Sequence, residues 1–235
     1  MLKKMFTGLF INSSRYYLDD FAREAANSVL RGALVLDAGA GNSPYKRHFS
    51  HTRYESADFC QVDKEYGEIT YVCDLTTIPV EDNRFDLVLC SQVLEHVPEP
   101  EKVLKEIFRV LKIGGTLWLT APLFYEEHET PYDFYRYTQY GLKYLLKETG
   151  FSITRIGWLE GYYGTLAYQL GIAAKTLPTR PNQYGSGIIG VAFAIIALLL
   201  KPLFAILSML FSRLDLRKKY VSAGQCKNYE IVATK

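Results

Sequence analysis

The sequence predicts an α/β fold built on an open, mostly parallel sheet, and two observations carry this prediction. An apolar run at residues 34–36 ends in Asp37 and is followed by the glycine-rich turn Gly39-Ala40-Gly41. Four further short β-rich segments follow, separated by turn signals and by one helical pattern, at residues 54–58, 69–75, 85–91 and 116–120. Strands that alternate with helices and loops in this way are typical of parallel sheets.

The turn after the first strand has the form of a nucleotide-cofactor site. Its glycines tolerate backbone angles that other residues avoid, and they let a ligand approach the main chain closely. Asp37 indicates the cofactor, because a carboxylate repels a pyrophosphate but attracts the ammonium and sulfonium groups of S-adenosylmethionine. A dinucleotide site also has a third glycine where this chain has Pro44, a residue that suits the first turn of a helix. An ordinary strand-to-helix turn is the alternative for this motif taken alone.

Acidic residues end two of the later strands, where they can bind the rest of such a cofactor. Asp58 follows the glycine turn by about twenty residues, the spacing at which a carboxylate meets ribose hydroxyls. Asp63 is the rival for this role, and a solvated turn carboxylate is the alternative for either. Asp74 lies in the segment 69–75 and is placed to accept a hydrogen bond from the adenine amino group.

The succession of these segments resembles the class I S-adenosylmethionine-dependent methyltransferases, in particular the type 11-like branch that acts on small molecules and lipids. The matching stretches are VLDAGAGN at 35–42, SADF at 56–59, the whole of 73–122, and the final NYEIVATK. The resemblance implies a Rossmann-like sheet of seven strands in the order 3-2-1-4-5-7-6, with the last strand antiparallel and helices on both faces. Asn42-Ser43-Pro44 departs from the family pattern and leaves the shape of this loop open.

The resemblance also implies S-adenosylmethionine as cofactor and nine residues that bind it. They are Asp37, Gly39, Ala40 and Gly41 at the methionine end, Asp58 at the ribose, Asp74 and Leu75 at the adenine, and Ser91 and Gln92 beside the reacting sulfonium.

Length and composition fit one α/β domain with an appendage. The 235 residues are 49% hydrophobic, and the net charge of +2 argues against a general nucleic-acid surface. The four cysteines are scattered, with no C-x-x-C pair and no histidine at zinc spacing, so we expect neither disulfides nor a metal site, and a cytoplasmic compartment. We expect four regions: an N-terminal segment and helix (1–30), the cofactor-binding domain (31–160), a helical insertion (161–220) and the last strand (221–235). The first eleven residues resemble an uncleaved segment that touches the membrane surface, with a frayed terminus as the alternative.

The apolar tract at residues 188–211 is the second unusual feature. It is long enough to cross a bilayer only with Lys201 and Pro202 near its middle, where a lysine is costly and a proline kinks a helix. The expected sixth and seventh strands, 150–156 and 229–234, flank the tract, so a single crossing would separate two strands of one sheet. We therefore favour a kinked re-entrant hairpin or interfacial segment on the cytoplasmic face of the inner or plasma membrane, with a single span and packing within protein as alternatives.

The loop at residues 121–138 is the candidate substrate lid, because it is crowded with aromatic and titratable side chains. Its His128 is the first candidate for a catalytic base and its Glu126 the second, and Tyr132, Tyr135 and Arg136 are expected to shape the lid. The alternative is a structural loop with an ion pair between Asp133 and Arg136. We expect His96 to be structural, and we expect His48 and His51 to be surface residues of the helix after the glycine turn.

These observations predict an S-adenosylmethionine-dependent methyltransferase at a membrane surface. The predicted acceptor is a small molecule, a lipid or a lipid-linked glycan, methylated on oxygen. A membrane-attached scaffold that binds the cofactor without transferring a methyl group is the alternative, and an NAD-linked oxidoreductase is a third hypothesis.

Overall fold

The computed structural model describes residues 13–235, so the predicted membrane contact of residues 1–11 lies outside the described residues. The chain divides into two compact units. One consists of Tyr17–Leu159 with Lys227–Lys235 and contains the sheet. The other contains Glu160–Cys226 together with residues 13–16. The division runs through the first described helix, whereas the predicted boundary at residue 31 assigned that whole helix to a separate N-terminal region.

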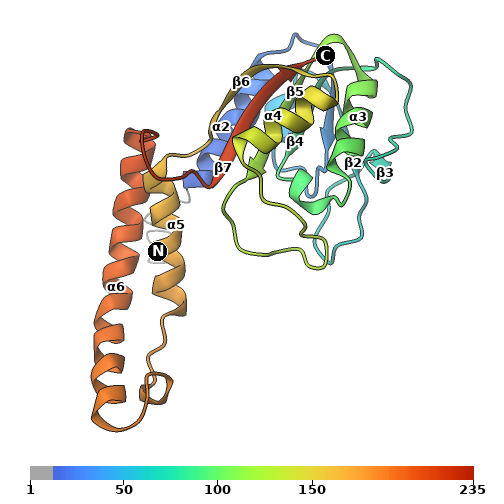
Figure 1. The fold of residues 1–235 in the computed structure, drawn as a ribbon. Helices are drawn as coiled ribbons and strands as arrows, with labels where there is room; N and C mark the ends of the chain where they lie inside the picture. The colour runs from blue at the N-terminus through green and yellow to red at the C-terminus, as the bar shows by residue number, and fades with distance from the viewer. Residues whose placement is uncertain (1–12) are drawn as a thin grey trace. The chain divides into compact units, whose positions relative to one another are not determined.

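The sheet unit has the predicted topology. Seven strands are hydrogen-bonded in the order β3-β2-β1-β4-β5-β7-β6, and β7 is antiparallel to both of its neighbours (Figure 1). Their bounds are β1 Leu34–Ala38, β2 Arg53–Asp58, β3 Tyr71–Val72, β4 Phe85–Ser91, β5 Leu111–Pro122, β6 Ser152–Trp158 and β7 Asn228–Thr234. The other strand pairs are parallel, so the carboxyl ends of β1 to β4 meet at one edge of the sheet.

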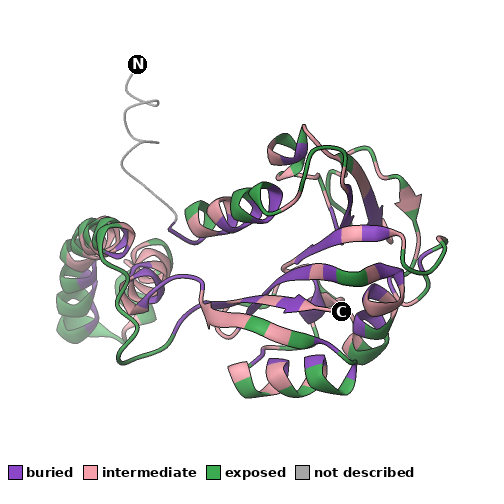
Figure 2. Cartoon of the chain, turned by 90° about the horizontal axis from the view of Figure 1, so that it is seen from above, coloured by how far each residue is buried: buried purple, intermediate pink, exposed green. Residues whose placement is uncertain are grey.

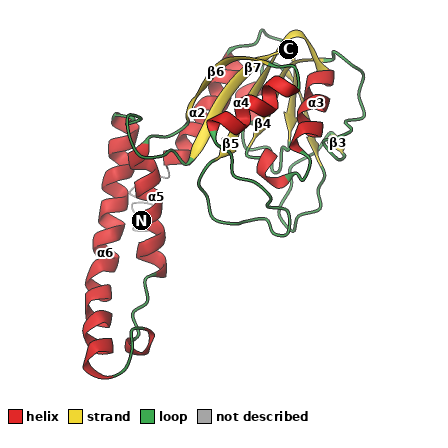
Figure 3. Ribbon diagram, viewed as in Figure 1, coloured by secondary structure: helices red, strands yellow, loops and turns green. Residues whose placement is uncertain are grey.

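In the described part of the chain, three α-helices accompany this sheet: α2 at Ser13–Asn27, α3 at Pro100–Val110 and α4 at Gln139–Glu148. Helix α2 lies on one face, and α3 and α4 lie on the other (Figures 2 and 3). The side of α2 that faces the sheet is apolar, and its Phe21 ring lies 5.0 Å from the ring of Trp118 on β5. All five residues of β1 are buried, which is typical of a central strand covered on both faces.

Two local expectations are wrong. The helix predicted after the glycine turn is only a 3-10 turn, η1 at Lys46–Phe49, because Ser43 adopts a positive φ of 52° and little chain remains before β2. His48 and His51 are half-buried rather than surface residues, since their Nε2 atoms lie 2.8 Å from Asp19 Oδ1 and 3.1 Å from the Ala26 carbonyl oxygen.

The second unit is a helical hairpin. Helix α5, Tyr162–Thr176, lies beside the 31-residue helix α6, Gly187–Arg217, and the short η3 at Pro181–Gln183 lies in the connection between them (Figure 1). Pro202 lies inside α6, which continues as one helix, so the tract is not broken in its middle. The Lys201 ammonium group donates hydrogen bonds to the carbonyl oxygens of Lys175 and Leu177, at 3.1 and 3.0 Å. The lysine therefore satisfies orphan carbonyl groups at the end of α5.

Helix α6 is long and apolar enough to cross a membrane, by length and composition alone. Much of its apolar surface is exposed (Figure 2). The exposed large side chains within its apolar part are Ile188, Ile189, Val191, Phe193, Ile195, Ile196, Leu198, Leu199, Leu203, Ile206 and Leu210.

Candidate active site

A cavity of about 450 Å³ opens at the carboxyl ends of β1 to β4. This is the edge at which open α/β sheets bind ligands, beside the point where the strand order reverses between β1 and β4. The size is within the usual range for small-molecule sites. Five of the nine predicted cofactor residues line it: Gly39, Asp58, Asp74, Leu75 and Gln92.

The glycine turn forms one side of this cavity. Gly39 has a φ of +80°, and a Cβ atom added there would lie 2.3 Å from Cγ2 of Val93, another lining residue. The Gly39 N–H donates to the carbonyl oxygen of Ala57 on β2, at 2.8 Å. Gly41, at φ +54°, donates its N–H to Oδ2 of Asp58 at 2.9 Å. Glycine is therefore required at residue 39 both for its backbone angle and for space.

The carboxylates at the strand ends occupy different environments. Asp58 is 5% exposed, and its Oδ1 also accepts the N–H of Cys60, at 3.1 Å. Asp74 is exposed at the cavity, and its Oδ1 accepts the Thr76 N–H and hydroxyl, both at 2.8 Å. Asp63, the rival to Asp58, is exposed and is not among the residues that line the cavity.

Four of the predicted cofactor residues do not line the cavity: Asp37, Ala40, Gly41 and Ser91. Asp37 is 3% exposed, and its Oδ2 accepts a hydrogen bond from the Tyr54 hydroxyl. Burial raises the pKa of Asp37 to about 7, although the Tyr54 hydrogen bond opposes this shift. Ser91 lies 3.0 Å from the Thr120 hydroxyl, and the Gln92 amide donates to the same oxygen at 3.1 Å.

Comparison with known proteins identifies the domain that carries this cavity. Residues 36–119 match the family model described as a methyltransferase domain. These residues form a class I methyltransferase domain. The cofactor of this family is S-adenosylmethionine, and the residues present fit it: a glycine at the close turn, a buried carboxylate at the end of β2, and an exposed carboxylate beside the apolar Leu75.

Individual relatives and solved structures are similar to this chain in sequence or in fold. A ubiquinone biosynthesis O-methyltransferase from Coxiella burnetii is 29% identical over 128 residues, which cover 49% of this chain and 52% of the relative. The chain thus matches about half the length of this curated relative. The [4+2]-cyclase SpnF has the same fold, with a TM-score of 0.57 at 19% identity, covering 93% of this chain and 80% of that one. A methyltransferase structure from Methanosarcina mazei gives a TM-score of 0.52 at 15% identity, covering 89% and 95%.

An ion pair within the predicted lid, the loop at residues 121–138, holds this loop in place. Arg136 donates to both oxygens of Asp133, at 2.6 and 2.8 Å, and to the carbonyl oxygens of Tyr125 and Glu126. The Arg136 guanidinium lowers the pKa of Asp133 to about 2. The ion pair between Asp133 and Arg136, which we expected if the loop is only structural, is therefore present. Tyr132 and Phe134 from the same loop nevertheless line the cavity, whereas the Tyr135 hydroxyl donates to the Pro98 carbonyl oxygen, at 3.0 Å.

The two predicted catalytic residues occupy different positions in the methyltransferase domain. Glu126 has an exposed side chain, and neither it nor His128 is among the residues that line the cavity. His128 is half-buried, and its Nε2 lies 3.2 Å from Nε2 of His96, which does line the cavity. His96, expected to be structural, therefore connects His128 to the cavity.

Glu95 is a residue that the sequence reasoning missed. It lies with His96 in the 3-10 turn η2, Leu94–His96, just after β4. Its side chain is fully buried, and no other residue among 13–235 gives either carboxyl oxygen a hydrogen bond. Burial raises the pKa of Glu95 to about 8. The only signal in the sequence is a charged residue inside the apolar segment VLEHV, which by itself also fits an exposed helix start.

Proposed function

We propose that this chain is an S-adenosylmethionine-dependent methyltransferase that transfers a methyl group to an oxygen of a small-molecule, lipid or lipid-linked glycan acceptor at a membrane surface. The observation that carries the proposal is the cavity at the strand ends, lined by Gly39, Asp58 and Asp74. Transfer to oxygen is supported by the ubiquinone biosynthesis O-methyltransferase among the relatives. S-adenosylmethionine supplies an activated methyl group when it is bound.

The chain's own residues would position the acceptor and keep water out. Tyr132 and Phe134 place aromatic surface at the cavity, and the Asp133–Arg136 ion pair holds the loop that carries them. Alignment and exclusion of water account for most of the catalysis when the donor is already activated. His128 remains our candidate for the group that takes the hydroxyl proton, because it contacts His96 at the cavity wall, whereas Glu126 is exposed.

Action at a membrane is supported by the apolar surface of α6. The helical hairpin leaves the sheet after β6 and returns to it at β7, and these two strands pair directly. Both ends of the hairpin therefore start from one side of any bilayer, which favours insertion from one face over a single crossing. The basic residues at the end of α6 and just after it suit the anionic cytoplasmic leaflet; they are Arg213, Arg217, Lys218 and Lys219.

Two variants test the cofactor site. Asp58→Ala should weaken S-adenosylmethionine binding by at least tenfold in calorimetry, because the side chain both faces the cavity and holds the Gly41 N–H. Asp63→Ala is the matched control and should bind as the unchanged protein does, since Asp63 is exposed and is not among the cavity-lining residues. Equal affinities for the two variants would contradict the assignment of Asp58.

Isotope-labelled methyl donor tests the reaction itself. Incubation of the full chain with this donor and a lipid extract should yield a labelled product in mass spectrometry, and Asp58→Ala should reduce its yield. Cofactor binding without any labelled product, from either lipid or soluble extracts, would favour the scaffold hypothesis. The cyclase of the same fold shows that the fold alone does not decide the reaction.

A further inference from the structure

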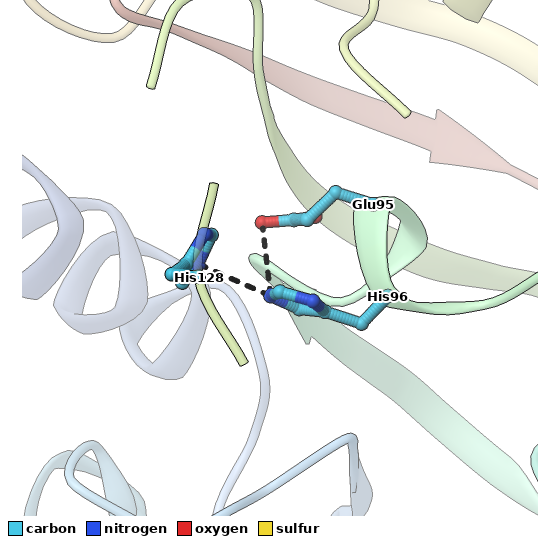
Figure 4. Close-up of side chains that lie close together, drawn as sticks. All are labelled: Glu95, His96 and His128. Carbon is cyan, nitrogen blue, oxygen red and sulfur yellow. Dashed lines mark hydrogen bonds and ion pairs between the residues drawn. The ribbon is translucent and has the colours of Figure 1, made fainter. Parts of the chain in front are cut away.

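Three potential metal ligands meet at the wall of the cavity, on two segments that are distant in sequence. Glu95 and His96 come from the turn after β4, and His128 comes from the lid loop (Figure 4). One ligand atom from each lies within 4.8 Å of the others. The expectation that the chain has no metal site considered only spacing along the sequence. The fold closes a gap of 32 residues between the two histidines.

The hydrogen bonds around the histidines show where their protons lie. Nδ1 of His96 is 2.6 Å from the carbonyl oxygen of Tyr132. Nδ1 of His128 is 3.2 Å from the carbonyl oxygen of Glu126 and 3.5 Å from Oδ2 of Asp133. All three oxygens are acceptors, because Asp133 is ionised in its ion pair with Arg136, so Nδ1 of each ring carries a proton. The neutral rings then direct the lone pairs of their two Nε2 atoms at each other across 3.2 Å.

Two facing lone pairs repel, and Glu95 adds a fully buried carboxyl group, for whose oxygens the described part of the chain supplies no hydrogen-bond partner from another residue. Oε1 of Glu95 lies 4.0 Å from Nε2 of His96, the same atom that Nε2 of His128 approaches (Figure 4). A proton between the rings would separate the lone pairs and place a positive charge 4.0 Å from Oε1 of Glu95, without direct contact. A divalent cation would engage all three side chains at once.

We propose that Glu95, His96 and His128 form a binding site for a divalent first-row transition metal, with Zn²⁺ as the best-matched ion. Two nitrogen ligands at about 2.0–2.1 Å from a tetrahedral zinc lie roughly 3.3 Å apart, close to the 3.2 Å between the two Nε2 atoms. The Glu95 oxygen lies 4.0 Å from Nε2 of His96, and the three ligand atoms lie within 4.8 Å of one another, so Glu95 reaches the same ion after a side-chain shift of about 1 Å.

The surroundings of the three side chains match those of known metal sites. Metal-binding histidines usually donate their second N–H to a carbonyl oxygen or a carboxylate, as His96 does to Tyr132 and His128 does to Glu126. Three protein ligands leave a fourth position open, which is characteristic of catalytic rather than structural zinc. His96 also lines the cavity, so the ion would lie at its wall.

One consequence rests on the proposed function. An ion at this place would lower the pKa of an acceptor hydroxyl bound to it, so that the hydroxyl would release its proton to solvent before methyl transfer, and His128 would act as a ligand instead of as the base. Metal binding itself requires no turnover, so it is tested separately from methyl transfer.

The test is calorimetric titration of the full metal-free chain with Zn²⁺, with Co²⁺ absorption as a second readout. We expect one tight site per chain and a rise in melting temperature with Zn²⁺. Glu95→Gln and His128→Ala should weaken this binding at least tenfold and remove the rise in melting temperature. His51→Ala is the matched control, because it removes a half-buried histidine that bonds a backbone carbonyl outside the site, and it should bind as the unchanged protein does.

Two results would overturn the proposal. One is the absence of stoichiometric binding of Zn²⁺ and Co²⁺ by the folded chain. The other is binding that Glu95→Gln, His128→Ala and His51→Ala reduce equally, because such binding would reflect scattered surface ligands. Circular dichroism of each variant verifies that it is folded. Because Zn²⁺ binding is measured without S-adenosylmethionine, failure here leaves the proposed methyltransferase activity standing.

Discussion

At the scale of single residues, the site combines groups that face the cavity with groups that support it from behind. Asp58 both lines the cavity and fixes the Gly41 N–H, so one side chain shapes the turn and presents a carboxylate. Asp37 is instead buried against Tyr54. Asp37 would therefore attract a bound cation by charge alone, without touching it, and the low dielectric constant of the protein between them would strengthen this attraction.

Asp37 gives the site a dependence on pH. Because burial raises the pKa of its carboxyl to about 7, Asp37 is mostly neutral at pH 6 and mostly charged at pH 8. A cationic cofactor binds the charged form better, so affinity for S-adenosylmethionine should rise several-fold between these pH values. Calorimetry at a series of pH values measures the change. Asp37→Asn should flatten this profile between pH 6 and 8; a profile of unchanged slope would assign the dependence to another group.

At the scale of elements, the strands with strong apolar patterns were predictable. The predicted fourth strand has the bounds of β4, and the predicted second and seventh strands differ from β2 and β7 by one residue at their starts. The third strand was expected at 69–75 but pairs only at Tyr71 and Val72, since pairing with β2 ends there. The fifth strand was expected at 116–120, but β5 runs from Leu111 to Pro122, because α3 already ends at Val110.

The sequence could predict those residues of the site that lie at the ends of strands. Carboxylates at the ends of adjacent parallel strands lie at one edge of the sheet, so the sequence could suggest Asp58 and Asp74 for this edge, although it left Asp63 as a rival to Asp58. Contacts between loops could not be placed, because loop paths depend on tertiary packing. The approach of His128 to His96, and the burial of Glu95 beside them, belong to this second class.

The junction between α5 and α6 has its own testable contact. Lys201→Met removes the two hydrogen bonds to the end of α5 and should destabilise the hairpin by about 1–3 kcal/mol. Hydrogen exchange followed by mass spectrometry should show faster exchange at the end of α5. Lys175→Met is the control, since its side chain is exposed and the loss of charge is the same. If both variants exchange alike, the Lys201 contact does not stabilise the hairpin.

At the scale of the whole molecule, the helical hairpin is an insertion between two paired strands. Trp158 on β6 lies opposite Tyr229 on β7, and the Leu159 N–H donates to the Asn228 carbonyl oxygen, at 2.9 Å. The strand ends on either side of the insertion are thus already close enough for a tight turn. The sheet unit has its own core and carries the whole cavity.

Replacement of residues 161–226 by an Asn-Gly turn should therefore preserve the sheet. The shortened protein then tests cofactor binding by the sheet unit separately from membrane binding by the hairpin. We expect affinity for S-adenosylmethionine to stay within a few-fold of that of the full chain, because every cavity-lining residue remains. Sedimentation with vesicles of anionic phospholipid should be lost, because the exposed apolar surface of α6 is removed. Continued sedimentation of the shortened protein would reject the hairpin as the membrane anchor.

The position of β7 in the sheet also determines the order in which the two units can be completed during biosynthesis. The ribosome makes β7 after the hairpin. In the sheet, however, β7 lies between β5 and β6, and each of these strands pairs with β7 and not with the other. The hairpin is therefore fully translated while the sheet still lacks an internal strand. The insertion of α6 into a bilayer that we propose can therefore begin during translation, before the sheet that carries the cavity is complete.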